Sequence, residues 1–401
     1  MITYAEALRR LMEKAVPVEG METVPLLYST HRVLAEDIVS PIAVPRWDNS
    51  QMDGYAVRAA ELAEASKDHP VVLPVSDRIP AGQVGSRLAQ GSVARIFTGA
   101  PMPEGADTVV PQENVEVTPE GVCFKSPVRE GAWVRRRGSD VPQGGVVLKK
   151  GARLTPAAIG MVASIGRAYV KVYRRLRVGI FFSGDELVQP GEPLPPGGIY
   201  NSNRFMIRSL LQELGCEALD LGSVPDTLEA TIEAFESAAA SADVILTTGG
   251  MSVGEEDHIK PAVEAVGSLN VWRVRLKPGK PLAFGEVRGV PFIGCPGNPV
   301  AGFVVFLMMA RPYLLRTMGL TDIDVKPMAV RADFDWLKPG DRQEFVRVRR
   351  NDEGGLDLYH TQNSQVLSSC AWADGLVDIP VGGTVRKGDM VSYYPFCQFF
   401  A

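Results

Sequence analysis

Three glycine-containing turns carry the groups that could bind a phosphate. They are SGDEL (183–187), TTGGMSVGEEDH (247–258) and GCPGNP (294–299). Glycine allows the backbone to approach a ligand closely and to present its N–H groups to an anion. Two of these turns also carry carboxylates, which would repel a phosphate unless a divalent cation lay between them. The pattern favours a site for Mg²⁺ and a phosphate-containing ligand, with solvated strand-to-helix connections as the alternative.

A further turn, KPGK (277–280), places two lysines on either side of a Pro–Gly pair. Both ammonium groups can converge on one small dianion, because an ammonium is a compact donor suited to an oxyanion of no fixed orientation. The chain has 42 basic and 47 acidic residues and a net charge of −5, so it offers no general attraction for anions or for nucleic acid. Any anionic ligand must therefore be held locally, and the rigidity of the Pro-flanked turn favours a small dianion here over a solvated turn.

The segment DNSQMDGYA (48–56) gathers two carboxylates, an Asn, a Ser and a Gly in nine positions. On its own it could be a solvated turn or one wall of a site for a charged ligand. The choice between a solvated turn and one wall of a site depends on the turns at 183–187, 247–258 and 294–299, which carry the other candidate groups.

An α/β unit is predicted to position these turns. The apolar run from Val178 to Phe182 predicts a buried strand, and apolar residues at helical spacing predict a helix over 201–215, capped by Ser202 or Asn203 and ended by Gly215. The same strand-and-helix unit recurs twice along the chain. A mostly parallel sheet is therefore expected over about 175–320, with ligands at the carboxyl ends of its strands.

The rest of the chain predicts β-rich domains and one N-terminal helix over 3–15. Short β runs broken by Pro and Gly fill 46–140, and alternating apolar and polar pieces beyond Thr321 predict a barrel or a sandwich. The five cysteines suggest neither a disulfide framework nor a CxxC metal site, and there is no run of eighteen apolar residues. We therefore expect a cytoplasmic protein that binds neither a membrane nor nucleic acid.

Six motifs, in this order, carry a resemblance to a known family: NSQMDGYAVR, TGAPMPEGADTVV, SGDELV, TTGGMSVGEEDHIK, KPGKPLAFG and GCPGNPVAG. They resemble the molybdopterin molybdenumtransferases, the molybdenum insertases that include the C-terminal E domain of gephyrin. The resemblance implies that adenylylated molybdopterin and molybdate react, assisted by Mg²⁺, to give molybdenum cofactor and AMP. Tungstate is nearly isosteric with molybdate and stays open as the oxyanion.

The resemblance also implies a multidomain architecture of α/β and β domains. An N-terminal domain (1–45 and 141–174) is interrupted by an inserted β domain (46–140), and a three-layer α/β molybdopterin-binding domain (175–322) precedes a C-terminal β barrel (323–401). The implied assembly is a homodimer whose active site lies between the α/β domain of one subunit and the β domain of the other. The molybdopterin adenylyltransferase and molybdoenzyme acceptors are implied as further partners.

The site residues are carried over motif by motif. The implied catalytic residues are Asp53, Thr98, Asp140, Glu186, Asp226 and Asp257, of which Glu186 and Asp257 are the candidates to hold Mg²⁺. The implied substrate-binding residues are Ser183, Gly184, Gly249, Gly250, Ser252, Gly254, Pro296, Gly297, Asn298 and Pro299. The implied molybdate-binding residues are Lys277, Lys280, Pro281, Arg342, Ser364 and Ser368.

One position departs from the family pattern, and two other functions stay open. Ala301 stands where many members carry Ser, so a hydroxyl contact to the oxyanion is absent or is replaced by a backbone N–H. A molybdopterin adenylyltransferase using ATP is one alternative, against which the additional β domains and the KPGK turn argue. A catalytically silent scaffold on the same fold is the other, against which the intact acidic residues of the motifs argue.

Overall fold

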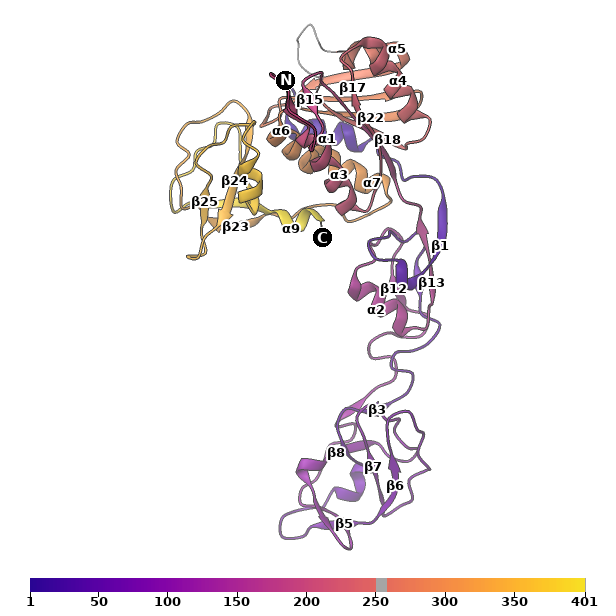
Figure 1. Ribbon diagram of the computed structural model, residues 1–401. Helices are drawn as coiled ribbons and strands as arrows, with labels where there is room; N and C mark the ends of the chain where they lie inside the picture. The colour runs from indigo at the N-terminus through magenta and orange to yellow at the C-terminus, as the bar shows by residue number, and fades with distance from the viewer. Residues whose placement is uncertain (250–257, 401) are drawn as a thin grey trace.

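The computed structural model describes residues 1–249 and 258–400, which form an elongated, bent molecule (Figure 1). The α/β unit lies at one end, with the C-terminal β unit beside it. A thin antiparallel ladder leads from the α/β unit to a small N-terminal unit, and the inserted β unit lies beyond that at the far end. Separate hydrophobic clusters form the cores of these parts.

The α/β unit is built on one mixed six-stranded sheet. In sheet order its strands are β17 (Glu217–Val224), β14 (Arg177–Ser183), β18 (Val244–Thr248), β22 (Val290–Cys295), β21 (Pro281–Val287) and β19 (Gly267–Arg273). The neighbours from β17 to β22 pair in parallel, and β22, β21 and β19 pair antiparallel. The predicted mostly parallel sheet is therefore confirmed, with an antiparallel edge.

Both faces of this sheet are covered, which explains the continuous apolar runs in its strands. Along β14, Ile180 and Phe182 pack in one cluster, whereas Phe181 packs in the cluster on the opposite face, because successive strand side chains alternate. The first cluster includes buried residues of α1 (Tyr4–Met12), α3 (Ser202–Leu214), α6 (Pro299–Val305) and α7 (Arg311–Thr317). The second includes those of α4 (Leu228–Ala239) and α5 (Ile259–Val266).

The boundaries of α3 correct one expectation and confirm another. The cap is Asn201, whose side chain accepts a hydrogen bond from the Arg204 N–H, and not Ser202 or Asn203. Gly215 ends the helix as expected, with φ of 89°.

The helical segment over 299–317, which includes a π-helical turn, is 19 residues long and apolar enough to cross a membrane by length and composition. However, 83% of its most apolar window is buried inside the protein. It therefore has the character of a core helix.

The N-terminal unit and its ladder connect the two ends of the molecule (Figure 1). The ladder pairs β1 (Met21–Pro25) with β13 (Tyr169–Tyr173), and a second pair joins β2 (Ile38–Val39) to β12 (Val146–Leu148) beside α2 (Pro156–Ser164). The helix α1 does not pack in this unit. Its buried residues Ala7 and Leu11 belong to the α/β core, so the N-terminal segment 1–45 contributes to two cores.

The inserted β unit is made of short strands in small sheets. The largest has the order β6 (Val75–Ile79), β7 (Val93–Ile96), β4 (Gly54–Val57) and β8 (Thr108–Pro111). The smaller sheets comprise β5 (Val71–Leu73), β10 (Gly121–Phe124) and β9 (Glu116–Thr118), and the pair β3 (Asn49–Ser50) and β11 (Val134–Arg135).

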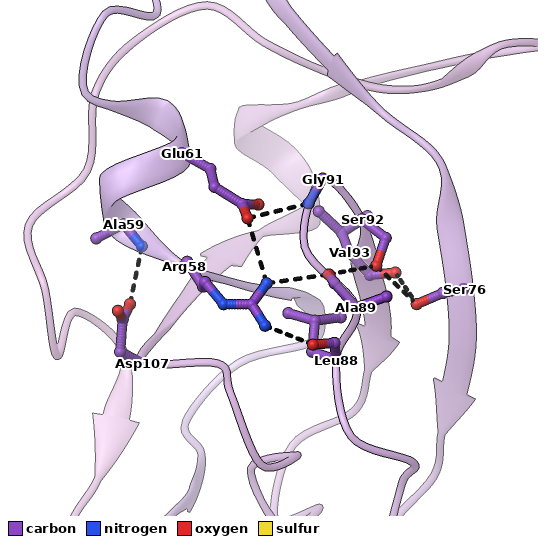
Figure 2. A network of polar contacts seen from close by, with 10 residues as sticks. All are labelled: Arg58, Ala59, Glu61, Ser76, Leu88, Ala89, Gly91, Ser92, Val93 and Asp107. Carbon is purple, nitrogen blue, oxygen red and sulfur yellow. Dashed lines mark hydrogen bonds and ion pairs between the residues drawn. The ribbon is translucent and has the colours of Figure 1, made fainter.

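A polar network holds a loop of this unit in place (Figure 2). Arg58 donates to the carbonyls of Leu88 and Ala89, at 2.5 and 3.0 Å, and its guanidinium lies 3.2 Å from the Glu61 carboxylate. Glu61 in turn accepts a hydrogen bond of 3.0 Å from the Gly91 N–H. The strands of this unit are short and form few ladder hydrogen bonds. Hydrogen bonds from side chains to backbone groups therefore hold its loops in place.

The C-terminal unit is a small closed β structure. Its strands are β23 (Met328–Arg331), β24 (Gln343–Arg350), β25 (Leu356–Leu358), β26 (Gly375–Ile379) and β27 (Met390–Pro395), followed by the short helix α9 (Phe396–Phe400). A bridge between Ala332 and Leu356 joins the β23 edge to β25 and closes the sheet into a barrel. The segment DFDWL (333–337) is one of the alternating apolar and polar pieces beyond Thr321, but it forms only an isolated bridge, at Trp336, and no strand.

One strand of this sheet comes from the α/β part of the chain. The two-residue strand β20 (Leu276–Lys277) pairs in parallel with β24. The lysine turn that follows β20 is therefore held at the junction between the α/β and C-terminal units.

Candidate active site

A cavity of about 980 Å³ lies at this junction, at the carboxyl ends of the parallel strands. The α/β unit contributes Ser183, Glu186, Leu187, Ile199, Tyr200, Asn201, Ser202, Asn203, Thr248, Gly249, Lys277, Pro278, Gly279, Lys280, Pro296, Gly297, Asn298, Pro299 and Ala301 to its lining. The C-terminal unit contributes Arg342, Gln362, Asn363, Ser364 and Gln365. The structure thus brings most of the predicted substrate-binding and molybdate-binding residues together in one place.

The first turn connects the ends of β14 and β17 through carboxylates. The Ser183 hydroxyl donates to the Asp226 carboxylate, which also accepts from the Asp185 N–H at 3.1 Å. The Asp226 N–H donates back to Asp185 at 3.1 Å. Asp226 therefore fixes the shape of the turn and does not line the cavity, whereas Glu186 does. Gly184 suits this turn, because its φ of 155° is a backbone conformation that residues with a side chain rarely adopt.

The second and third turns lie against each other. The Gly249 N–H donates to the Cys295 carbonyl at 3.1 Å, and a Cβ on Gly297 would lie 3.2 Å from the Gly249 Cα. Asn203 bridges them, because its amide donates to the Gly297 carbonyl at 2.7 Å and to the Thr248 hydroxyl at 3.2 Å. The Asn203 side-chain oxygen is buried and has no hydrogen-bond partner among the described residues. Sequence analysis treated Asn203 only as a helix cap and missed this contribution.

The two lysines of the KPGK turn have different surroundings. The Lys277 ammonium lies 2.9 Å from the carboxylate of Glu344, a residue that is only 5% exposed. Lys280 is exposed, lines the cavity and forms no ion pair within the described ranges. The expectation that both lysines offer a full charge to an anion therefore needs correction, because Glu344 offsets the charge of Lys277.

The C-terminal unit contributes a loop that approaches the third turn. Asn298 donates to the Ser364 hydroxyl at 3.2 Å, and the Val300 N–H donates to the Ser364 carbonyl at 3.1 Å. Ala301, in place of the frequent Ser, lines the same wall. Ser368 does not line the cavity, and its hydroxyl lies 3.0 Å from the Tyr359 hydroxyl.

Arg347, a residue that sequence analysis missed, holds this loop. Its guanidinium is buried and contacts the Ser369 hydroxyl at 3.2 Å and the Asn363 carbonyl at 3.4 Å. Gln362 accepts from the Arg347 N–H at 2.8 Å and donates to its carbonyl at 3.2 Å. Burial lowers the pKa of Arg347 to about 10, so the side chain still carries its proton at neutral pH. An arginine within an alternating strand carries no sequence signal that distinguishes it from a solvated one.

Asp53 and Thr98 form a second polar cluster, in the inserted β unit. The Asp53 carboxylate accepts from the Thr98 N–H at 2.8 Å and from the Thr98 hydroxyl at 2.7 Å. These hydrogen bonds, with a smaller contribution from the charge of Arg95, lower the pKa of Asp53. The next residue along the chain is Gly54. A Cβ at this position would lie 2.1 Å from the Val110 carbonyl oxygen, so a side chain does not fit there.

Within one chain this cluster and the cavity do not meet, because the inserted β unit lies at the opposite end of the molecule (Figure 1). Asp140 also lies away from the cavity, where its N–H donates to the Val44 carbonyl at 3.0 Å. The predicted catalytic residues are therefore divided between two distant places. Gly250, Ser252, Gly254 and Asp257, and the side chain of Pro281, lie outside the described part of the chain.

The described residues do not make a complete Mg²⁺ site. Over 1–249 and 258–400, no group of three His, Cys, Asp or Glu residues is arranged to hold a metal ion. Glu186 supplies a carboxylate to the cavity and fits as one ligand, while its predicted partner Asp257 is not described.

Cavity and fold together define a class of protein. It is a multidomain α/β protein with a cavity at the carboxyl edge of a largely parallel sheet, lined by glycine-containing turns, two lysines and an arginine. Comparison with protein families identifies the class further. Residues 2–166 match the MoeA N-terminal region (domain I and II), 179–316 a probable molybdopterin binding domain, and 329–396 the MoeA C-terminal region (domain IV).

Full-length relatives agree with these matches. The molybdopterin molybdenumtransferase of Haemophilus influenzae is 37% identical over 404 residues, covering 99% of both chains. That of Bacillus subtilis is 36% identical and covers 96% of this chain and 91% of its own. The chain therefore belongs to the molybdopterin molybdenumtransferase family, and the expectation of a transferase of molybdenum cofactor biosynthesis is confirmed at the level of the family.

The fold has a counterpart among solved structures. The crystal structure of the molybdopterin biosynthesis moeA protein from Pyrococcus horikoshii OT3 matches with a TM-score of 0.87 and 29% identity. The match covers 99% of this chain and 100% of that one. The predicted multidomain α/β and β architecture is thus confirmed.

Proposed function

We propose that this protein transfers molybdenum from molybdate to adenylylated molybdopterin and releases AMP. The observation that carries the proposal is the composition of the cavity at the carboxyl edge of the sheet. It combines two glycine-rich turns, which suit the phosphates of an adenylylated ligand, with Lys277, Lys280 and Arg342, which suit a small dianion. A site for one anion alone would not need both sets.

The proposed roles follow from the contacts of each group. The backbone of Gly249 and Gly297 approaches the phosphates, and Asn203 holds these two turns in register. Lys280 and Arg342 bind the oxyanion, with Ser364 nearby on the C-terminal side. Phosphoryl chemistry depends mainly on positioned charge, so a cavity of this kind needs few reactive side chains.

The division of the predicted catalytic residues supports a proposed homodimer. Asp53 and Thr98 cannot reach the cavity of their own chain across the length of the molecule (Figure 1). We therefore assign them to the cavity of a second copy, where the Asp53 carboxylate would face the strand ends. Asp140 lies on the connection between the units and is assigned to the same shared site.

The proposed reaction uses Mg²⁺. Glu186 is proposed as one ligand of the ion, and Asp257, which lies outside the described residues, as another. The ion, when bound, would neutralise phosphate charge beside these carboxylates. Tungstate is proposed as a competing oxyanion, because its size and charge match those of molybdate. A cytoplasmic location, and transfer of the product to molybdoenzyme acceptors, are proposed with it.

An assay of AMP release tests the proposal. The full-length protein is incubated with adenylylated molybdopterin and Mg²⁺, with and without molybdate, and AMP is quantified by chromatography. We expect AMP release that saturates with molybdate concentration. AMP release that is independent of the oxyanion would contradict it and favour hydrolase activity. In a separate incubation with ATP and molybdopterin, formation of adenylylated product would favour adenylyltransferase activity. No AMP release by the folded protein would instead support a silent scaffold.

A further inference from the structure

A buried carboxylate lies directly behind one wall of the cavity. Glu344 is 5% exposed, and its carboxylate oxygen lies 2.9 Å from the Lys277 ammonium. The same ammonium lies 5.7 Å from the centre of the Trp336 ring, while 39% of the Lys277 side chain stays exposed. We propose that Glu344 is a positioning residue that holds Lys277 at the cavity wall and limits how tightly the oxyanion binds. This inference rests on the proposed function of the cavity.

Backbone pairing brings the two side chains together. Lys277 lies on β20 and is the direct neighbour of Glu344 on β24 in the parallel ladder. On the other side of the carboxylate, a Cβ on Gly340 would lie 2.4 Å from a Glu344 oxygen. The turn itself is equally confined, because a Cβ on Gly279 would lie 2.4 Å from the Val305 side chain. The ladder thus places the two residues side by side, while 39% of the Lys277 side chain stays exposed.

The pair determines how much charge the cavity presents to a dianion. The charges of Lys277 and Glu344 cancel, so Lys280 and Arg342 supply most of the net positive charge of the lining. Arg342 is itself only 3.6 Å from the exposed carboxylate of Asp341. An oxyanion that is a substrate must leave its site during each turnover, and tight ground-state binding does not accelerate that step. Glu344 is placed to keep this binding weak.

The substitution Glu344→Gln isolates the charge. Glutamine keeps the shape and accepts a hydrogen bond from Lys277, but it removes one negative charge about 3 Å from the ammonium. We expect the Kd for molybdate, measured by calorimetric titration of the full-length protein, to fall about tenfold. The KM for molybdate in AMP release should fall with it, while kcat does not rise. If Glu344 had a merely structural role, the substitution would damage the site, and the Kd for molybdate would rise instead of fall.

A matched control lies on the adjacent strand. Asp378 accepts hydrogen bonds of 2.9 Å from the Gln343 amide and does not contact Lys277. Asp378→Asn removes a carboxylate from the same sheet and should leave the Kd for molybdate within about twofold of the parent value. An equal change in both variants would overturn the proposal, since it would reflect general charge alone.

A double-mutant comparison tests whether the two charges offset each other. The Kd for molybdate of the variant Lys277→Gln/Glu344→Gln should lie between the tightened Kd of Glu344→Gln and the weakened Kd of Lys277→Gln, and a Kd as weak as that of Lys277→Gln alone would overturn the proposal. If Lys277→Gln does not fold, the dependence of molybdate binding on salt concentration is measured instead of the double-mutant comparison. Glu344→Gln should then lose affinity for molybdate more steeply with ionic strength than the parent does. An equal slope would overturn the proposal.

The outcome for the parent protein separates this inference from the proposed function. A parent that binds molybdate and releases AMP, with an unchanged or weakened Kd in Glu344→Gln, refutes the role of Glu344 alone. A parent protein that neither binds molybdate nor releases AMP refutes both the role of Glu344 and the proposed function.

Discussion

Lys277 and Lys280 carry the same charge three positions apart but differ in what their loss would do to the protein. Lys277 neutralises the buried carboxylate of Glu344, whereas Lys280 is exposed and lines the cavity. Sequence reasoning placed both in one oxyanion site because a Pro–Gly turn separates them. It could not find Glu344, because the partner lies 67 positions further along the chain (344 − 277) on another unit.

We predict that Lys277→Gln and Lys280→Gln both weaken molybdate binding but differ in stability. Lys277→Gln leaves a buried carboxylate without its cation, which should lower the free energy of unfolding by about 3 kcal/mol. Lys280→Gln should change it by less than about 0.5 kcal/mol, as is usual for an exposed side chain. Urea denaturation measures both values. Equal stability of the two variants would contradict the ion pair described here.

The carboxylate of Asp53 gives a prediction about pH. Its pKa is lowered by the hydrogen bonds from Thr98, so the native state holds the charged form to lower pH than the unfolded chain does. The stability that this group contributes is therefore present above the unfolded pKa and is lost as the pH falls through the folded one.

Thr98→Val removes the hydroxyl donor and keeps the backbone donor, so the pKa of Asp53 should rise toward its ordinary value. A carbon-detected NMR titration of the Asp53 carboxyl measures the shift directly. If Asp53 acts as a carboxylate, the acid limb of AMP release should move to higher pH by the same amount. A pKa that does not change in Thr98→Val would show that the hydroxyl bond is not formed in solution.

At the scale of elements, the strands β4 and β8 approach so closely that only glycine fits at position 54. A Cβ would lie 2.1 Å from the Val110 carbonyl oxygen, and backbone cannot move aside as a flexible side chain can. The glycine of the MDGY motif therefore has a structural reason independent of catalysis.

We expect Gly54→Ala to lower the free energy of unfolding by more than about 3 kcal/mol, because it forces two paired strands apart. AMP release should be lost, since Asp53 precedes the displaced residue. Molybdate binding at the distant cavity should be retained in calorimetric titration. Loss of binding as well would show that the inserted β unit and the cavity do not fold independently.

The elements that could be predicted are those with a strong local pattern. Val178 to Phe182 and the helix at 201–215 follow from apolar spacing, since each buries a continuous face. The edge strand β17 was missed because its residues are mostly half-exposed and show no apolar run, and β20 is only two residues long. Residues that act through distant partners, such as Asn203, Glu344 and Arg347, leave no local pattern at all.

At the scale of the whole molecule, the shape explains why the motifs needed for one reaction lie so far apart. The DNSQMDGYA segment belongs to a unit at one end, and the glycine-rich turns belong to a unit at the other (Figure 1). A thin ladder, β1 paired with β13, is the connection between the α/β and N-terminal units. Such a connection keeps the inserted β unit and the α/β unit of one chain apart. This arrangement suits a site assembled from two copies of the chain.

Subunit complementation tests this shared site most directly. Asp53→Ala and Glu186→Gln are each expected to abolish AMP release, because each damages both sites of a homodimer. When the two variants are mixed and subunits exchange, half of the mixed dimer's sites receive an intact Asp53 from one chain and an intact Glu186 from the other.

We predict that the mixture regains molybdate-dependent AMP release, up to about a quarter of the parent activity for random exchange of equal amounts with one working site in each mixed dimer. Exchange is verified with a differently tagged partner, and the unmixed variants serve as controls. If exchange is complete and the mixture stays inactive, the site is built within one chain, and the assignment of the inserted β unit to the cavity of a second copy is wrong.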